Sequence, residues 1–296
     1  MPQHIADKLA DAIAQTGSPV CVGIDPRYDR FPAELTTSNP TPTQTLEAFR
    51  TFCFTVVDQV AGLVPAIKPQ SAYFEVLGPA GVELYFETIS RAHEKGLLVI
   101  GDVKRNDIGS TAEAYAAAHL SGPDKPDFIT INGYLGEDGI APFVDIARAE
   151  GKGVFVLVRT SNPSAKSVQD FCDDSGKPLY KHVAEMVGRV GSDCLSDSGY
   201  SCVGAVVGAT WPEEAAELRR LMPEQLFLVP GYGAQGATAK DCAAGYKEDG
   251  SGALVNASRS VIYAHANKDY AFTAWPDAIH EAARLFAQEI ASAVMP

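Results

Sequence analysis

The chain has 296 residues, and its 24 lysines and arginines stand against 37 aspartates and glutamates, which gives a formal net charge of −13. This surplus of negative charge argues against a general binder of nucleic acid or of membrane surfaces, because such proteins carry a basic face. It leaves room for a small anionic ligand, since a site can be positive inside a negative protein. A chain of this length can bury a large core without disulfides or structural metals.

The six cysteines are scattered and form no C-x-x-C pair, so they predict neither a zinc ribbon nor a thioredoxin-type motif. We expect free thiols in a reducing compartment. The first 18 residues mix charged and apolar side chains and do not resemble a signal peptide. No run approaches the roughly 18 apolar residues of a membrane span. We therefore expect a cytoplasmic protein that binds neither a membrane nor nucleic acid.

Eight short runs rich in β-branched residues recur along the chain. Several are apolar throughout, as parallel strands buried on both faces are. The predicted strands are Val20–Asp25, Pro65–Lys68, Leu97–Lys104, Asp127–Asn132, Gly153–Arg159, Cys202–Gly208, Leu226–Pro230 and Ala253–Ser258. The amphipathic segments between and after them predict helices at Thr43–Leu63, Gly81–Lys95, Ser110–Leu120, Gly139–Glu150, Leu179–Leu195, Pro212–Leu221, Thr238–Lys247 and Ala271–Val294.

Local signals support two of the helix starts. Pro212 suits a first helical turn, and Ser110 with Glu113 three residues later resembles a capping box.

Strands that alternate with helices in this number predict an α/β protein with a (β/α)₈ barrel. A doubly wound sheet uses the same alternation and is the alternative architecture. No internal segment is rich enough in Pro, Gly and Ser to mark a boundary, so we expect a single barrel domain over residues 1–296. Two long loops, at about 27–42 and 160–178, follow the first and fifth strands. For most of their length we expect them to be surface insertions.

Barrel enzymes keep their chemistry at the C-terminal ends of the strands, so charges that end apolar runs are candidate site residues. Asp25 ends the first strand, although a lone Asp there is usually a solvated strand end. Asp102 and Lys104 form a stronger signal, because residues two apart share one face of a strand. If Ile100 points inward, both charges do too, which is costly unless they are paired. Lys68 ends the neighbouring strand and is the expected further partner; a structural ion pair at the barrel rim is the alternative.

A second cluster follows the last two strands. Gly231, Gly233 and Gln235 come after the seventh strand, and Arg259 comes after the eighth. Barrels often bind phosphate with these two loops. Glycines let backbone N–H groups approach phosphate closely, and arginine offers a bidentate fork. The pattern predicts a phosphate subsite, with Arg105 as a competing cation.

Residues 102–111 read DVKRNDIGST, which resembles the D-x-K-x-x-D-I-x-x-T signature of orotidine 5′-monophosphate decarboxylases. The resemblance extends in the family's order to residues 22–26, 67–70, 230–235 and 258–263. Residues 67–75 are similar to the longer bacterial subgroup. Asn106 and Ser258 stand where glycine is usual in the family.

The resemblance implies a barrel enzyme that converts orotidine 5′-monophosphate to uridine 5′-monophosphate and CO₂ in pyrimidine synthesis, without a metal or an organic cofactor. It also implies a role for each of nine residues. Lys104 is the cation near C6 and its proton donor, Asp102 lies beside the departing carboxylate, Lys68 orients the charges and contacts the ribose, Asp25 contacts the ribose, Ser161 contacts the pyrimidine, and Gln235 and Arg259 grip the phosphate. Asp107 and Thr111 resemble residues that reach the partner's site in a homodimer.

Two rival functions use the same residues differently. In a metal-dependent decarboxylase, aldolase or epimerase, Asp102 and Asp107 would bind a divalent cation. An inward Lys104 between them disfavours that arrangement. A catalytically silent protein that binds a nucleotide phosphate could also use the barrel as a scaffold, but the intact set of two aspartates and a lysine argues against it.

Overall fold

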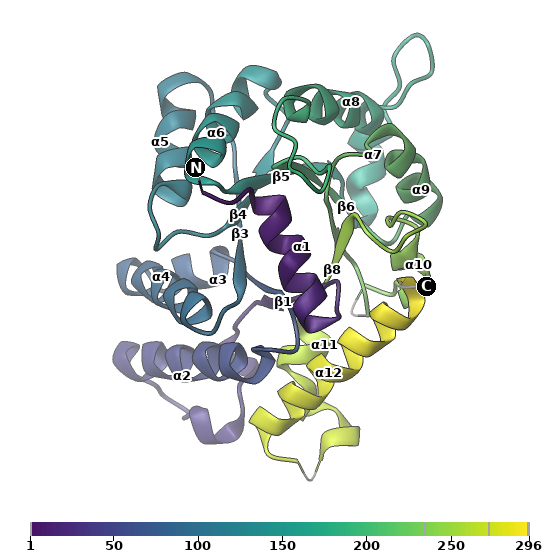
Figure 1. Cartoon of the computed structure of the whole chain (residues 1–296). Coiled ribbons are helices and arrows are strands. Elements are labelled where there is room, and N and C mark those ends of the chain that lie inside the picture. Colours follow the sequence, from purple (N-terminus) through teal and green to yellow (C-terminus); the bar gives the residue numbers. More distant parts are fainter. Residues whose placement is uncertain (1, 234, 272, 295–296) are drawn as a thin grey trace.

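The computed structural model describes residues 2–233, 235–271 and 273–294. In it, eight parallel strands pair in chain order and close into a barrel, with β8 hydrogen-bonded to β1 (Figure 1). The strands are β1 (Val20–Ile24), β2 (Ala66–Pro69), β3 (Leu98–Arg105), β4 (Phe128–Asn132), β5 (Gly153–Arg159), β6 (Val203–Val207), β7 (Phe227–Pro230) and β8 (Ala253–Ala257). The predicted (β/α)₈ barrel is confirmed. The doubly wound alternative is wrong, because such a sheet stays open and reverses its strand order.

Helices surround the barrel (Figure 1). The longer ones and α10 are α2 (Pro42–Val60), α4 (Pro79–Glu94), α5 (Gly109–Leu120), α6 (Glu137–Glu150), α8 (Leu179–Gly191), α9 (Pro212–Leu221), α10 (Ala239–Ala243) and α12 (Trp275–Val294). Short helices α3 (Ala72–Glu75), α7 (Lys166–Gln169) and α11 (Arg259–Ile262) lie in loops after β2, β5 and β8. Single 3₁₀ turns occupy Tyr28–Arg30, Ala33–Leu35, Pro163–Ala165, Ala264–Ala266 and Lys268–Tyr270. Phe272, inside the last predicted helix, lies outside the described residues.

The two predicted helix starts had different outcomes. Helix α9 begins at Pro212, as expected. The predicted capping box at Ser110 is wrong, because α5 begins at Gly109 with Ile108 as its N-cap and without a side-chain cap. Ser110 is already inside the first turn, where its hydroxyl cannot serve as the cap of the residues after it.

Helix α1 (Ile5–Thr16) was not among the predicted elements, and it lies across the N-terminal end of the barrel (Figure 1). The ring of His4 caps its first turn by accepting a hydrogen bond from the Ala6 N–H at 3.2 Å. The other ring nitrogen of His4 lies 3.1 Å from the carbonyl oxygen of Cys194, and the Asp7 carboxylate accepts a hydrogen bond from the Ser198 N–H. Helix α1 therefore closes the end of the barrel opposite the C-terminal ends of the strands.

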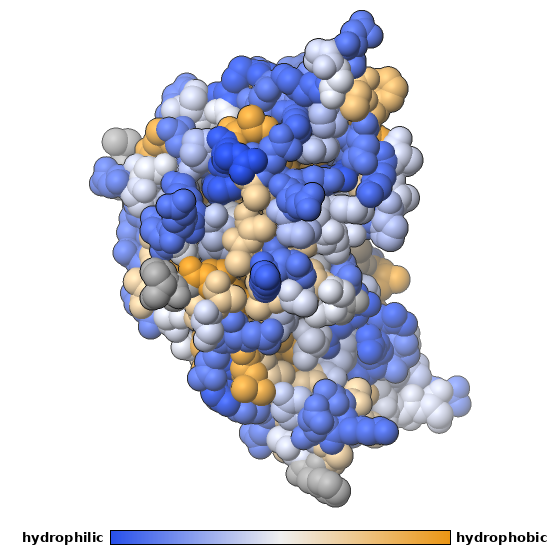
Figure 2. Space-filling model, turned by 90° about the vertical axis from the view of Figure 1, so that its right-hand side faces the viewer, coloured by the Kyte–Doolittle hydropathy of each residue, from blue (hydrophilic) through white to orange (hydrophobic). Residues whose placement is uncertain are grey.

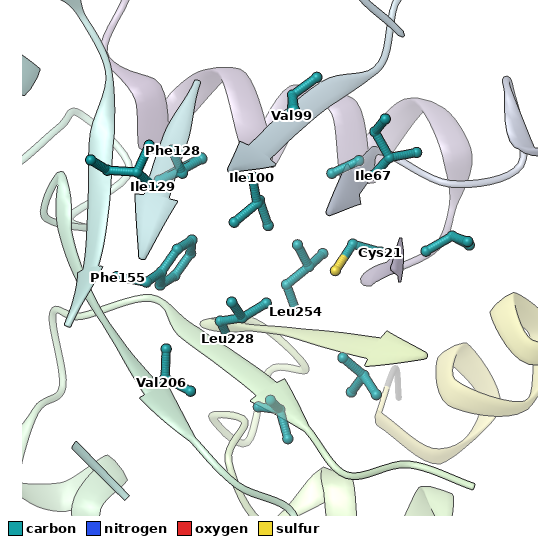
Figure 3. Packing of buried hydrophobic residues seen from close by; sticks show 14 of the residues in the cluster. Cys21, Ile67, Val99, Ile100, Phe128, Ile129, Phe155, Val206, Leu228 and Leu254 are labelled. Atoms are coloured by element: carbon teal, nitrogen blue, oxygen red, sulfur yellow. The ribbon is translucent and has the colours of Figure 1, made fainter. Parts of the chain in front are cut away.

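The interior of the barrel is packed with apolar side chains (Figure 3). Ile100, Phe155, Leu228 and Leu254 point into the space that the strands enclose, whereas Val99 points outward. This alternation confirms that Ile100 faces inward, which is the condition from which the inward placement of Asp102 and Lys104 was predicted.

The surface carries the surplus charge. Figure 2 shows one side of the molecule as mainly hydrophilic, with apolar side chains in small groups between polar ones. Within the described residues, no helix combines the length and the apolar character that crossing a bilayer requires.

Arg219 of α9 ties several segments together at the N-terminal end of the barrel. Its buried guanidinium lies 3.6 Å from the centre of the Phe227 ring, and burial lowers its pKa to about 10. It donates hydrogen bonds of 2.7–2.9 Å to the carbonyl oxygens of Gly245, Met222, Gln225 and Gly252.

We expect Arg219→Met to lower the free energy of unfolding by about 3 kcal/mol, because it leaves several carbonyl groups without their donor. Urea denaturation followed by circular dichroism measures the change. Arg220→Met is the matched control, since Arg220 is exposed on the same helix. Equal midpoints for the two variants would contradict the structural role of Arg219.

Candidate active site

A cavity of about 500 Å³ opens at the C-terminal ends of the strands. Six of the nine predicted site residues line it, and they come from segments far apart in the chain: Asp25, Lys68, Asp102, Lys104, Ser161 and Gln235. This is the end of the barrel where the fold places its chemistry.

Asp102 bridges the two lysines at the base of this cavity. Its Oδ2 accepts a hydrogen bond from Lys68 Nζ at 2.7 Å, and its Oδ1 accepts one from Lys104 Nζ at 2.5 Å. Asp102 and Lys68 are buried, whereas the Lys104 side chain is 47% exposed. The three side chains therefore form a chain of alternating charge that ends in an accessible ammonium group.

The array fixes the ionisation of its buried members. Burial alone would raise the pKa of Asp102, but the ammonium groups of Lys68 and Lys104 hold that pKa well below its ordinary value. Burial would lower the pKa of Lys68, yet the carboxylates of Asp102 and Asp25 raise it above its ordinary value. Both groups are consequently charged at neutral pH.

The backbone at Lys104 departs from a regular strand. Lys104 has a φ of 44°, and no other non-glycine residue among those described has a positive φ. The pairing of β3 with β4 shifts register between Gly101 and Arg105. This left-handed conformation costs a non-glycine residue about 1 kcal/mol or more. The prediction that Lys104 joins Asp102 in the barrel interior therefore has the right outcome, but an irregular backbone produces it.

Thr130 of β4 supports this irregular backbone, and the sequence reasoning missed it. Its Oγ1 accepts a hydrogen bond from the Lys104 N–H at 3.0 Å and donates one to Asp102 Oδ1 at 2.9 Å. The sequence signal for it is a single hydroxyl between apolar residues of the strand, and it lies before the strand end, where the charged candidates lie.

Gln70 and Asn256 are two further polar residues of the cavity that were not predicted. Gln70 Nε2 donates a hydrogen bond to Asp102 Oδ2 at 2.9 Å. It follows Lys68 by two positions, so the alternation argument that joined Asp102 to Lys104 could have found it. Asn256 lies inside β8, where a polar residue interrupts an apolar run.

Three predicted residues lie outside this cavity. Asp107 is half-buried after β3, and its Oδ1 accepts a hydrogen bond from the Ile108 N–H at 2.9 Å. Thr111 is exposed in the first turn of α5, and Arg259 is exposed directly after β8.

The two loops of the predicted phosphate subsite meet one another. A Cβ on Gly233 would lie 3.5 Å from Ser260 Oγ, so the loop after β7 lies against the start of α11. Position 234, within the predicted segment 230–235, lies outside the described residues.

The arrangement offers electrostatic stabilisation and proton transfer. The Lys104 ammonium is held by Asp102, so a negative charge developing beside it needs no reorientation of the site. The same group can deliver a proton. Within the described ranges, no three His, Cys, Asp or Glu side chains are grouped so that they could hold a metal ion.

Comparison with known proteins identifies the family of the chain. The sequence profile of the "Orotidine 5′-phosphate decarboxylase / HUMPS family" matches residues 18–273. The orotidine 5′-phosphate decarboxylase of Rhodopirellula baltica is 46% identical over 289 residues, covering 94% of this chain and 95% of that protein. The enzyme of the same name from Clostridium perfringens strain 13 is 42% identical over 279 residues, with coverages of 93% and 96%.

A solved structure extends the similarity to three dimensions. The OMP decarboxylase of Leishmania donovani superimposes with a TM-score of 0.76 at 32% sequence identity, covering 98% of each chain. The profile match and the relatives both span most of the sequence. The chain therefore belongs to the orotidine 5′-phosphate decarboxylase family.

Proposed function

We propose that Lys104 is the proton donor to C6 when the enzyme converts orotidine 5′-monophosphate to uridine 5′-monophosphate and CO₂, the decarboxylation that its family performs in pyrimidine synthesis. The observation that carries this proposal is the contact of Lys104 Nζ with Asp102 Oδ1 at 2.5 Å inside the cavity. Asp102 in turn is held by the buried Lys68.

The chemistry explains why an ammonium group belongs there. When the bond between C6 and the carboxylate breaks, its electron pair stays on C6, where resonance stabilises it little. The Lys104 ammonium lowers the energy of this developing negative charge. It then transfers its proton to C6 and completes the product. Because the Lys104 side chain is 47% exposed, solvent can restore that proton after turnover.

The remaining predicted residues divide the substrate among them in this proposal. Asp102 lies beside the departing carboxylate, Asp25 and Lys68 contact the ribose, Ser161 contacts the pyrimidine, and Gln235 and Arg259 grip the phosphate. Binding energy from the phosphate, which is remote from the reacting carbon, can be used to organise the site.

We further propose that the enzyme is a cytoplasmic homodimer in which Asp107 and Thr111 reach the partner's site. Neither residue lines the cavity of its own chain. Exposed apolar side chains lie close to them in sequence: Ile108, 55% exposed, follows Asp107, and Tyr115, 38% exposed, lies one turn after Thr111 in α5. In the proposed dimer these apolar side chains would be buried against the partner, which favours association. All six cysteines are free thiols, as a reducing compartment favours.

Mixing two inactive variants tests the shared site. We expect Lys104→Ala and Asp107→Ala to be inactive alone. After unfolding and refolding together, they should recover about one quarter of the wild-type rate per subunit, because a hybrid dimer holds one intact site. The loss of orotidine 5′-monophosphate absorbance measures the rate.

Hybrid formation is verified by native mass spectrometry of chains that carry different isotopes. Hybrids that form without recovered activity would rule out a site shared between subunits. A parallel assay in a chelator addresses the metal-dependent alternative, which requires that activity disappear.

A further inference from the structure

The segment at the end of β5 that carries Ser161 is held from behind by α7. Gln169, the last residue of α7, binds Thr160 twice. Its Oε1 accepts a hydrogen bond from the Thr160 N–H at 3.1 Å, and its Nε2 donates one to Thr160 Oγ1 at 2.8 Å. Because the amide of Gln169 binds both the backbone N–H and the hydroxyl of Thr160, it fixes the backbone position at that residue.

Contacts from the loop after β6 hold the same segment at other atoms. Trp211 Nε1 donates a hydrogen bond to the Thr160 carbonyl oxygen at 3.0 Å, and Thr210 Oγ1 donates one to the Ser161 carbonyl oxygen at 3.3 Å. Gly208 permits this close approach, because a Cβ there would lie 3.0 Å from the Ser161 backbone. Among the described residues, no hydrogen bond uses the Ser161 Oγ, and Ser161 lines the active-site cavity.

Arg159 anchors the end of α7 in turn. Its side chain is fully buried and lies between the rings of Tyr180 and Trp211, at 4.9 and 4.8 Å from their centres. Its Nη1 forms an ion pair of 2.7 Å with Asp170, the residue after Gln169, and donates a longer hydrogen bond to Gln169 Oε1. The loop at 160–178 was expected to be surface insertion for most of its length, yet around Gln169 it is bound to the site.

Thr160 separates two cavities. It lines the active-site cavity and also a second cavity of about 190 Å³, whose walls include Gln169, Leu157 and Tyr180. Without the hydrogen bonds of Gln169, the segment would have room to move away from the substrate.

We infer that Gln169 is a positioning residue for base recognition: by binding Thr160 on the side away from the substrate, it sets the position of the Ser161 hydroxyl that meets the pyrimidine. This inference rests on the proposed contact between Ser161 and the base. The inferred role of Gln169 concerns the base alone, because the residues proposed to hold the ribose and the phosphate lie on other strands and loops.

The inference is tested by the binding of two ligands, one with the base and one without it. We expect Gln169→Met, which keeps the length of the side chain but removes both hydrogen bonds, to raise the Kd of uridine 5′-monophosphate about tenfold. The Kd of ribose 5-phosphate should stay within about twofold of wild type, because this ligand has no base. Gln169→Glu, which keeps an acceptor for the Thr160 N–H, should recover part of the affinity for the nucleotide. Isothermal titration calorimetry measures the Kd of each ligand for the wild type and for both variants.

Ser167→Met is the matched control, since it places the same side chain at an exposed position of α7 that lines neither cavity. Equal weakening of both ligands by Gln169→Met would show a general structural role and overturn the inference, as would unchanged affinity for the nucleotide. Ser161→Ala tests the base contact separately from the positioning role of Gln169. If it leaves nucleotide affinity unchanged, the proposed base contact fails; if it weakens the nucleotide while Gln169→Met does not, only the positioning role fails.

Discussion

Lys104→Ala is expected to lower kcat by at least about 10⁴-fold while the protein stays folded, because the substitution removes both the cation beside C6 and the proton donor. The fold should survive, since Asp102 keeps its ion pair with the buried Lys68 after the change. Ultraviolet monitoring of orotidine 5′-monophosphate gives the rate, and circular dichroism reports the fold.

Lys95→Ala is a suitable control for the loss of a lysine, because Lys95 is exposed at the end of α4, ahead of β3, and far from the cavity. A Lys104→Ala enzyme that retains a rate near that of the control would refute the mechanism. A rate that falls with an unfolded spectrum would instead assign Lys104 to the fold.

Asp102→Asn should damage both catalysis and stability. Removal of the carboxylate charge leaves the buried Lys68 ammonium without its nearest counter-ion, a situation that costs about 3–5 kcal/mol in other proteins. We expect kcat to fall by roughly 10³-fold or more, because the Lys104 ammonium loses the partner that orients it. Urea denaturation and the ultraviolet assay measure the two effects.

A double variant separates these effects. Asp102→Asn with Lys68→Met should recover much of the stability, since no unpaired buried charge remains, and none of the activity. Recovery of activity in the double variant would show that Lys68 and Asp102 form only a structural ion pair at the barrel rim, which is the alternative to a catalytic role.

Acid titration of wild type and Asp102→Asn gives an independent check. The pKa of Asp102 in the folded protein lies below its ordinary value, which is about 3.9 in an unfolded chain. Below pH ~4 the unfolded chain therefore binds a proton at this site that the folded protein does not, and stability falls. The stability difference between wild type and Asp102→Asn should be full above pH ~5 and narrow toward pH 3. A difference that does not change with pH would contradict the assignment.

Much of the architecture was accessible from the sequence because parallel barrel strands have a distinct pattern. Runs such as Val203–Val207 are apolar on both faces, and the segments between them are amphipathic. Helix α1 was not predicted, although Ile5, Leu9 and Ile13 recur at helical spacing. Helix α1 precedes the first strand and lies outside the β/α repeat, so the repeat does not predict it.

The candidate site was predicted where charges end strands, and it was missed where polar groups lie inside them. The inward position of Asp102 follows from the alternation of side chains along a strand, whereas Lys104 reaches Asp102 through a left-handed backbone that breaks this alternation. The hydroxyl of Thr130 accepts a hydrogen bond from the N–H of Lys104, whose backbone is left-handed, and no side-chain pattern in the sequence predicts that conformation. The contact of Gln169 with Thr160 could not be predicted from the sequence, because it depends on how a long loop folds back onto the end of β5.

The left-handed backbone of Lys104 has a consequence for computational redesign of this enzyme. A method that ranks amino acids by how well they suit the local backbone would choose glycine at position 104, since glycine alone adopts a φ of 44° without penalty. The position would then score as improved while the ammonium group that contacts Asp102 disappeared. Disagreement between conformational preference and the residue present at position 104 is what the proposed role of Lys104 leads one to expect, because functional sites are where local rules are broken.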